Sequence, residues 1–589
     1  MKKKRFILPL LAVSLLAGCS KDESSAGLDN GGQEGEPQYL TVNLVTASAS
    51  GASTLKTRAA GNQHPGKPDE ETDTYEEGLA GENTVSKIRF YFFDKDGAAV
   101  GVKKNGENSW QNYLDWTNIS EEGKKDPNVE KILSAMLVIN TKKGDKQPDK
   151  IVAIINPQET ADTYSLGGTA PDLYAVTGDY QKFVSGNFVM SNSTFKNGNA
   201  KEMEVSVDGK IFDTPGKALK TPVEIYVERT VAKVRLNSSL SEISEGSGIY
   251  STKTPATETT EEKTQTVTLN DDDGEKEIYV KFLGWNTTAV ADKTRLIKEI
   301  NPGWDIALFG NAPWNWTDYH RSFWAVNAAG LNYQYGAFDD SNKTGDNLFQ
   351  AREKSKFDKS QWVYVNENAS DTYADGNWND SIRTKVIIAA QLVDETGAAL
   401  EFAEYGTERC SVDKLKNTFA DNCGLYKKTS SNPETYVKIT QAELKIVTAT
   451  EIGMASKTQN GRYKVYIQLN DDAAQDGIWY PSNASGQTEP LTALKANEAL
   501  KNLGSAKVWK NGYTYYYFDI KHLGDSYGVV RNHIYDANIT TLTGLGTPVY
   551  KPEEIIYPER PEPDTDTYIA ARINILSWRV VSDNVKLDW

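Results

Sequence analysis

Cys19 is the residue whose surroundings best suit covalent chemistry. It follows four basic residues, Lys2 to Arg5, and an apolar run from Phe6 to Leu16. This run has the length of a secretory signal and is too short to cross a membrane as a helix. The run ends in Leu16-Ala17-Gly18-Cys19, which places a nucleophilic thiol where such a signal would be cut. A secretory signal with a Cys at this point by chance is the alternative.

The segment from Leu16 to Cys19 resembles the lipobox of bacterial lipoproteins. The resemblance implies that residues 1–18 are a signal peptide and that Cys19 carries the acyl chains. The next residues, Ser20-Lys21-Asp22-Glu23, are similar to the surface-export signal of Bacteroidetes lipoproteins. No later segment is long and apolar enough to span a bilayer, so we expect attachment to the outer membrane by lipid alone.

Arg58 lies where a protease could act. Small residues fill much of 46–60, and a polar, acidic stretch with Pro and Gly continues to about Asn83. Segments of this composition are exposed and easily cleaved. We therefore expect a protease of trypsin-like or Arg specificity to cut between Arg58 and Ala59, with Lys56 as a second candidate.

Other residues that could do chemistry form no recognisable catalytic pattern. The chain lacks HExxH, GxSxG and phosphate-loop motifs, so we expect no enzyme and no cofactor. The net charge of −16 argues against nucleic acid as a partner. With only four His and no close His/Cys spacing, no metal site is expected. The two acidic turns that begin at Asp94 and Asp271 lack the final Glu of a calcium loop and are interpreted as hairpin turns.

Two further Cys, Cys410 and Cys423, could form a disulfide outside the cytosol or remain separate buried thiols. Arg229 and Arg531 lie in strand-like segments, where a core ion pair or a turn brace is the expected role.

Alternating apolar residues separated by Asp, Asn and Gly turns predict an all-β protein made of β-sandwich domains. In Gln38 to Ala47, Leu40, Val42 and Leu44 share one face. Ile88, Phe90 and Phe92 alternate before a hairpin at 94–97. Further strands are predicted at 150–155, 223–227, 231–236, 277–283, 385–393, 437–447, 463–469 and 513–520, and a helix at 490–503.

The end of the chain differs in composition from the rest. Residues 548–567 are rich in Pro, Glu and Asp, which predicts an extended linker. Residues 568–589 then form an apolar strand pattern whose phase changes near Leu576, where we expect a bulge or bend. The apolar anchors of this tail are Ile569, Ile573, Ile575, Leu576, Trp578, Val580, Val585 and Leu587. Such a strand must fold back on its own body or enter another molecule.

A detachable strand at each end suggests an exchange. The strand at 38–47 would fill a groove in the new subunit and leave after the cut at Arg58. The tail of the next identical subunit would then enter the groove, as in donor-strand complementation. This contact is head-to-tail and does not close, so it builds a filament.

Several motifs together resemble the fimbrilins of Bacteroidia, the type V pilus subunits, and especially the Mfa-type major subunits. They are Val227-Glu-Arg-Thr-Val-Ala-Lys-Val234, Tyr527-Gly-Val-Val-Arg-Asn-His-Ile-Tyr535, Gly544-Leu-Gly-Thr-Pro-Val549 and Ile573-Asn-Ile-Leu-Ser-Trp-Arg-Val-Val581. The resemblance implies two transthyretin-like β-sandwich domains, at 59–235 and 236–547, after a propeptide at 19–58. It also implies adhesive fimbriae with anchor and tip subunits as further partners. The residues beyond Leu587 depart from the expected end of the chain.

Two other interpretations stay open. Aromatic residues between Trp304 and Trp324, with Trp362 and Trp378 beyond, could belong to a surface glycan-binding lipoprotein, although core packing explains them as well. A tip or accessory fimbrial subunit is the closer alternative, but the presence of both detachable strands favours a stalk subunit.

Overall fold

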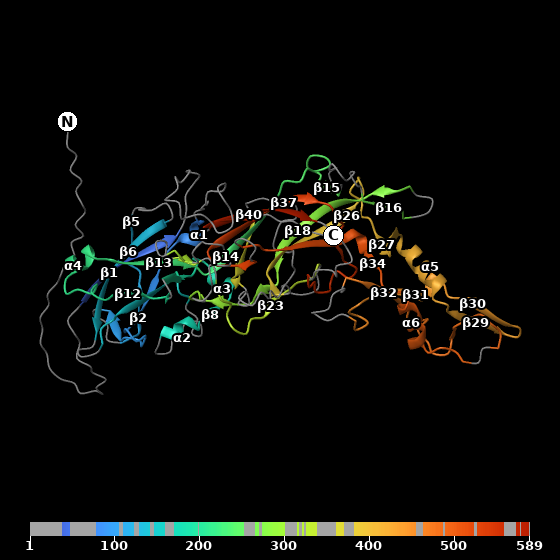
Figure 1. The fold of residues 1–589 in the computed structure, drawn as a ribbon, viewed down its shortest axis with the longest axis horizontal. Helices are drawn as coiled ribbons and strands as arrows, with labels where there is room; N and C mark the ends of the chain where they lie inside the picture. Colours follow the sequence, from blue (N-terminus) through green and yellow to red (C-terminus); the bar gives the residue numbers. More distant parts are fainter. Residues whose placement is uncertain are drawn as a thin grey trace.

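The structure is a computed structural model that describes the following residues: 38–47, 78–104, 110–122, 129–141, 146–158, 170–197, 200–252, 265–269, 274–300, 315–316, 321–322, 325–338, 361–369, 382–454, 463–486, 489–522, 527–558, 573–577 and 579–587. Strands are far more common than helices in these residues, which confirms the predicted all-β, sandwich-type fold. The molecule is elongated, with the first sheet at one end and a small lobe at the other (Figure 1). No helix within the described ranges is long and apolar enough to cross a membrane.

The first sheet is built from residues 38–229 and has the order β3-β6-β1-β13-β9-β7-β2-β4, with β5 on β6 and β12 on β7. Strands from both ends of this order contribute to one apolar core, so the sheet curls around it. Its strands are β1 (Gln38–Ala47), β2 (Ile88–Phe93), β3 (Val102–Lys104), β4 (Tyr113–Trp116), β5 (Ser120–Glu122), β6 (Val129–Thr141), β7 (Lys150–Ile155), β9 (Met190–Asn192), β12 (Val205–Ser206) and β13 (Val223–Arg229).

Four short helices accompany this sheet. Helix α1 leads into β2, and α4 lies beside β1. Leu173 of α2 and Phe183 of α3 pack into a second apolar cluster, on the other face of β2 and β7 from the first core. The helices are α1 (Ala80–Asn83), α2 (Ala170–Tyr174), α3 (Tyr180–Phe183) and α4 (Pro215–Lys220).

Among the described residues after Thr230, two sheets face each other across a shared core. One has the order β24-β14-β37-β39-β40 and the other β15-β18-β26-β35-β38. The strands are β14 (Val231–Ser238), β15 (Ile249–Ser251), β18 (Tyr279–Thr288), β24 (Trp362–Asn366), β26 (Lys385–Val393), β35 (Tyr513–Asp519), β37 (His533–Leu542), β38 (Thr547–Pro548), β39 (Ile573–Ser577) and β40 (Arg579–Leu587).

The passage from the first sheet to the second pair of sheets takes a single residue. β13 ends at Arg229 and β14 begins at Val231. The sequence-based boundary between 235 and 236 therefore falls inside β14.

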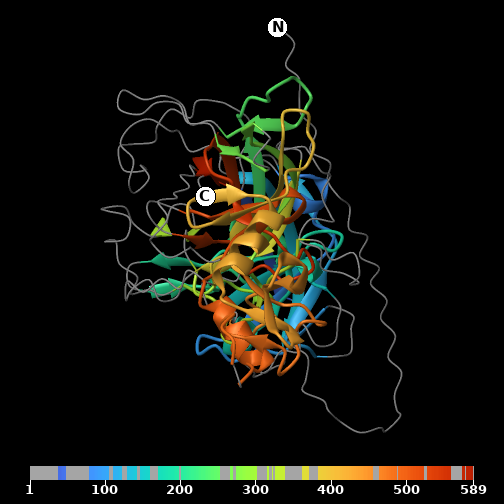
Figure 2. The ribbon, with the colours of Figure 1, turned by 90° about the vertical axis from the view of Figure 1, so that its right-hand side faces the viewer.

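A lobe with its own apolar core is inserted between β26 and β35. Its helices stand in front of the sheets when the molecule is viewed from that end (Figure 2). This lobe lies within the second domain expected from the sequence, at 236–547, and was not predicted as a separate unit. Its elements are β27 (Phe402–Tyr405), β28 (Glu408–Cys410), α5 (Val412–Asn422), β29 (Tyr426–Ser431), β30 (Glu434–Lys438), β31 (Leu444–Thr448), β32 (Val465–Leu469), β33 (Trp479–Tyr480), α6 (Ala493–Lys501) and β34 (Lys507–Trp509).

The structure refines two predictions of local structure. The strand expected at 437–447 is interrupted by a 3-10 turn, Gln441–Glu443, because Thr440 and Glu443 form a capping box there. The bulge or bend expected near Leu576 is a complete chain reversal, since β39 and β40 pair antiparallel with Leu576 opposite Arg579. The tail is thus a hairpin, and β40 pairs in parallel with β37 from Ile534 to Leu542.

The acidic turn at Asp94 is a hairpin turn. The Asp94 carboxylate accepts backbone N–H bonds from Asp96 and Ala98, both at 2.9 Å. Asp394 repeats the motif, accepting from Ala398 at 3.0 Å. Both turns close with a Gly in the left-handed region, where a side chain would be strained.

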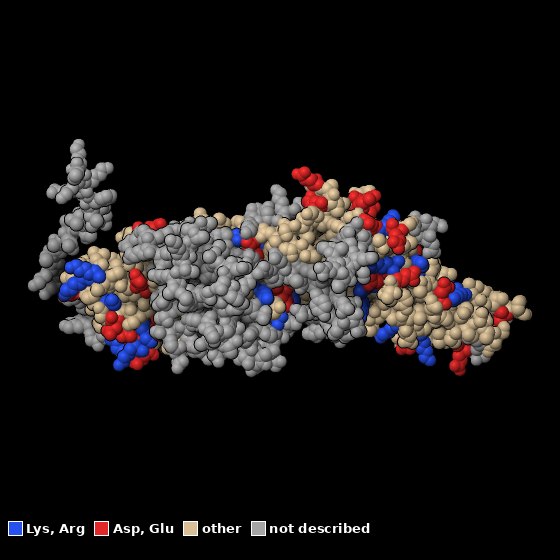
Figure 3. Space-filling model, turned by 45° about the horizontal axis from the view of Figure 1, so that its top comes forward, with Lys and Arg blue, Asp and Glu red and all other residues tan. Residues whose placement is uncertain are grey.

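On the face shown in Figure 3, basic and acidic side chains lie next to each other at both ends of the molecule. Elsewhere the structure pairs such neighbours directly, as in Lys217–Asp213 and Lys445–Asp471.

Candidate functional site

The candidate site is the groove that β1 occupies in the first sheet. β1 pairs antiparallel with β6 along its whole length and in parallel with β13 from Val42 to Thr46. It is therefore a central strand, although it comes first in the chain. Leu40, Val42 and Leu44 are fully buried in the apolar core. The apolar residues of β6 alternate in the same way as those of β1. They line the same core and are Leu133, Ala135, Leu137 and Ile139.

A short segment before β13 closes one end of the groove. The backbone N–H of Tyr39 donates to the carbonyl of Phe212 at 2.7 Å, and the N–H of Phe212 donates back at 2.9 Å. The first residues of β1 thus lie between β6 and Phe212, and the later residues lie between β6 and β13. Phe212 could not be found from the sequence, because no local pattern marks an isolated bridge.

The other face of β1 is also covered. Thr41 is 2% exposed and Asn43 is 4% exposed. Ile132 of β6 and Tyr226 of β13 pack together on this sheet, in the row of Val45. A strand in this groove must therefore fit on both faces.

β14 takes the corresponding place in the second pair of sheets. β1 is the first strand of its sheet and runs parallel to the late strand β13, and β14 runs parallel to the late strand β37 in the same way. The difference is the connection. β14 is held to β13 through Thr230, whereas β1 is joined to α1 by residues 48–77, which contain Arg58.

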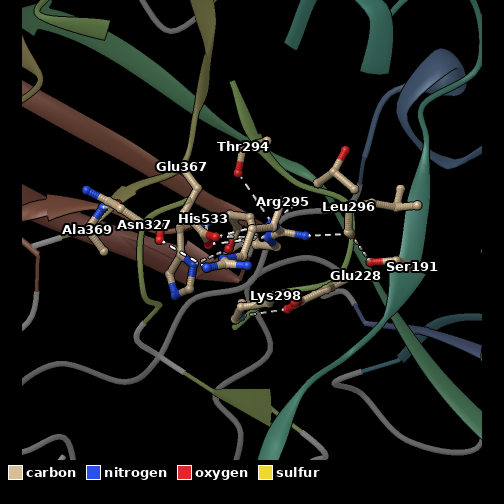
Figure 4. A network of polar contacts seen from close by, with 12 residues as sticks. Ser191, Glu228, Thr294, Arg295, Leu296, Lys298, Asn327, Glu367, Ala369 and His533 are labelled. Atoms are coloured by element: carbon tan, nitrogen blue, oxygen red, sulfur yellow. Dashed lines mark hydrogen bonds and ion pairs between the residues drawn. The ribbon is translucent and has the colours of Figure 1, made fainter. Parts of the chain in front are cut away.

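Buried charges hold the two halves of the molecule together beside this groove (Figure 4). The Arg531 guanidinium pairs with Glu367 and donates to the carbonyl of Leu296 at 2.9 Å. The Ser191 hydroxyl donates to the same carbonyl at 2.7 Å. Arg531 is thus in the buried ion pair that the sequence predicts for it. Arg229 donates to the Glu82 carbonyl at 2.9 Å and to Asn532, which makes it a brace between the halves.

Glu82 fastens the beginning of the body to the same junction. Its carboxylate lies 2.5 Å from Lys233 Nζ and accepts a hydrogen bond from the Tyr364 hydroxyl. Burial alone would raise the pKa of Glu82, but the Lys233 charge and these hydrogen bonds outweigh burial and lower it below the ordinary 4.5. The Lys233 ammonium also lies 5.0 Å from the centre of the Trp362 ring, which places this Trp in the packing of the junction.

Several of the predicted site residues lie outside the described residues. They are Cys19, Arg58, Ala59, Ile569 and Trp578, and most of the aromatic cluster between 304 and 324 is outside as well. Of the other tail anchors, the structure describes the backbone, in β39 and β40. Cys410 and Cys423 are free thiols in the structure, which favours the alternative of separate thiols.

The described residues contain no group of three or more His, Cys, Asp or Glu that could hold a metal ion.

Residues 507–584 match the family described as "Major fimbrial subunit protein type IV, Fimbrillin, C-terminal". This stretch contains β35, β37 and β39, and it ends within β40. The match confirms the resemblance to fimbrilins and supports a role as a fimbrial subunit at the cell surface. No curated protein sequence matches the chain significantly.

Two solved structures align with most of the chain. One is a fimbrilin from Porphyromonas gingivalis W83, with 14% identity over 93% of this chain and 97% of that chain, and a TM-score of 0.32. The other is a proposed cell adhesion protein from Parabacteroides distasonis ATCC 8503, with 12% identity over 91% of this chain and 96% of that chain, and a TM-score of 0.33.

Proposed function

We propose that this protein is a stalk subunit of adhesive fimbriae and that it polymerises by exchanging β1 for the tail strand of another copy. One observation carries the proposal. β1 is bonded on both sides and buries three apolar side chains, yet only the segment with Arg58 joins it to the body. A central strand with a cleavable connection can be removed without cutting the rest of the fold.

The proposed pathway has a precursor and a mature form. The precursor is lipidated on Cys19 and carried to the outer face of the outer membrane. An Arg-specific or trypsin-like surface protease then cuts after Arg58, and the propeptide at 19–58 leaves. The mature subunit begins at Ala59 and joins the extracellular fimbrium, where anchor and tip subunits complete the assembly.

The empty groove would be unstable alone. Loss of β1 exposes the edges of β6 and β13 and the apolar pockets of Leu40, Val42 and Leu44. Unpaired strand edges bind other strands readily. Each apolar side chain of the incoming tail that is buried in the groove could gain about 1.5–3 kcal/mol, before the costs of association.

The tail must first leave its own body, where β40 pairs with β37. A strand in the groove has a partner strand on each side, whereas the tail hairpin lies at the edge of its sheet. Each backbone hydrogen bond contributes a net ~0.5–1.5 kcal/mol, so the central position is the stronger one. This difference favours transfer to a neighbour once β1 has gone.

Residues 548–572 form the arm that carries the tail. The root of this arm, residues 548–558, can stay fixed during the transfer. Glu554 accepts a hydrogen bond from the Thr448 hydroxyl at 2.7 Å, and Lys551 pairs with Glu451 at 3.1 Å. The Tyr557 ring packs on Tyr335 with their centres 4.6 Å apart. Residues 559–572 follow this anchored root, and an extended chain of that length spans at most about 50 Å.

The test uses the soluble chain from Ser20 to Trp589 and a matched chain that ends at Thr567. Both are treated with an Arg-specific protease, and size is followed by gel filtration and electron microscopy. We expect cleavage near Arg58 and filaments from the full chain, while the shortened chain is cut and stays monomeric. An Arg58→Gln chain should form no filaments under the same protease. A full chain that is cut after Arg58 and stays monomeric would refute the proposal.

A further inference from the structure

The strand that leaves and the tail share a short stretch of sequence. Residues 41–46 are Thr-Val-Asn-Leu-Val-Thr, and residues 572–577 are Arg-Ile-Asn-Ile-Leu-Ser. Five of the six positions keep the same chemical character, including the Asn in the middle. If the two stretches occupy the same site, each residue of the tail must suit the environment that β1 has in the groove.

The core-facing positions of β1 in this stretch are Val42 and Leu44, both fully buried. Ile573 and Ile575 have the same spacing. Aliphatic side chains of similar volume are the substitutions that a packed core tolerates best.

On its opposite face, β1 has first a polar residue, Asn43, and then an apolar residue, Val45. Asn43 stands in the row of Glu224 and Ser134, and Val45 stands in the row of Tyr226 and Ile132. The tail offers Asn574 and Leu576 at the corresponding places. The change of phase near Leu576 therefore has an explanation, since the groove has an apolar patch on its second face at this position.

We propose that residues 572–577 of one copy occupy the register of residues 41–46 in the next copy, with Asn574 in the place of Asn43. The incoming strand runs parallel to β13 and antiparallel to β6, as β1 does. Ile573 and Ile575 fill the pockets of Val42 and Leu44. This inference rests on the proposed function and assigns the part of the tail that enters the groove.

The Asn sets the register. A slip by one residue turns every side chain of a strand to the other face. Such a slip would carry Asn574 into the apolar core and would move Ile573 or Ile575 to the polar position of Asn43. One polar residue in an apolar seam fixes register in this way in coiled coils. β40 lacks the match, because Asp583 and Lys586 interrupt its apolar positions.

Cross-linking in the assembled filament tests the register. Two versions of the chain from Ser20 are mixed before cleavage, both with Cys410→Ser and Cys423→Ser. One carries Ser134→Cys in β6, and the other carries Asn574→Cys in the tail, so only a bond between two molecules gives a dimer. After assembly, the thiols are oxidised and dimers are counted on a non-reducing gel.

The matched pairs are Ser134→Cys with Ile573→Cys, which represents a slip by one residue, and Ser134→Cys with Asn584→Cys, which represents entry of β40. We expect at least ten-fold more dimer from the Asn574 pair than from either matched pair. A second pair, Ile132→Cys with Leu576→Cys, keeps Asn574 and should also cross-link. The uncut chain with Asn43→Cys and Ser134→Cys checks the geometry, since these positions face each other in the structure.

The outcomes separate the two proposals. Filaments that cross-link through Ile573 or Asn584 overturn the register and keep the strand exchange. The register is also overturned if neither the Asn574→Cys pair nor the Leu576→Cys pair cross-links in filaments, although the Asn43→Cys pair cross-links in the uncut chain. Cleaved chains that form no filaments overturn the strand exchange itself, and the register with it.

Discussion

Lys298 and Glu228 form a buried ion pair between the two halves of the molecule, with Nζ 2.9 Å from Oε2. Glu228 lies on β13, the strand that flanks β1, and Lys298 follows β20 (Thr294–Arg295) in the second half. Neither side chain is more than 3% exposed. The wall of the groove is thus fastened to the rest of the body by charges that have no access to water.

Replacing one member of this pair should be worse than replacing both. Lys298→Met leaves the Glu228 carboxylate buried without its cation, and such a loss costs about 3–5 kcal/mol of unfolding free energy. The double variant Lys298→Met with Glu228→Gln removes the uncompensated charge and should recover at least half of that loss. Urea unfolding of the three chains measures the difference. A double variant as unstable as the single one would contradict this account.

Glu82 should make stability depend on pH. Because its pKa is lowered in the folded state, its contribution is complete above about pH 4.5 and is lost as the pH falls through the folded value. Glu82→Gln removes the charge opposite Lys233 and should cost about 3 kcal/mol at pH 7.

The difference between the wild type and Glu82→Gln should shrink as the pH falls below 4.5, because the carboxyl becomes neutral in both states. Unfolding by urea at pH 7, 5 and 3.5 measures it. The exposed carboxylate of Asp213, paired with Lys217, provides a control, and Asp213→Asn should leave stability nearly unchanged. A Glu82→Gln difference that stays constant with pH would refute the role of this charge.

Leu44→Ala should weaken the precursor and leave the filament unchanged. Leu44 is fully buried in the core of the first sheet, and such truncations cost about 2–5 kcal/mol. A weaker β1 leaves sooner after cleavage, so filaments should appear earlier. The filament itself no longer contains residue 44, and its resistance to heat should equal that of the wild type. Val437→Ala, at an exposed position of the lobe, serves as the control.

The strands that the sequence predicts best are those with local signals. The bounds of β1, β7 and β26 agree with the sequence, because the alternating pattern of β1 and the continuous apolar runs of β7 and β26 end at polar or turn residues. The break within 437–447 was also readable in principle, since Thr440 and Glu443 have the spacing of a capping box.

Which strands form the walls of the groove could not be predicted, because they are far apart in the chain. β1 pairs with β6 and β13, which begin at Val129 and Val223. Strand pairing of this range depends on the whole fold and leaves no local pattern. The charged pair Glu228–Lys298 is similar, because each residue alone has the composition of an ordinary exposed position. The sequence does indicate that the apolar strands at 38–47 and 568–589 each require a partner strand.

Ala571→Leu should strengthen the joint between subunits. In the proposed register, residue 571 takes the place of Leu40, whose side chain is fully buried in the precursor. The tail therefore underfills this pocket, and a Leu should add about 2 kcal/mol per joint. The measurement is the temperature at which filaments dissociate in detergent, which should rise. Ala570→Leu, one residue earlier and on the other face, should have a much smaller effect. Equal effects of the two substitutions would argue against this register, because alternate residues of a strand face opposite sides.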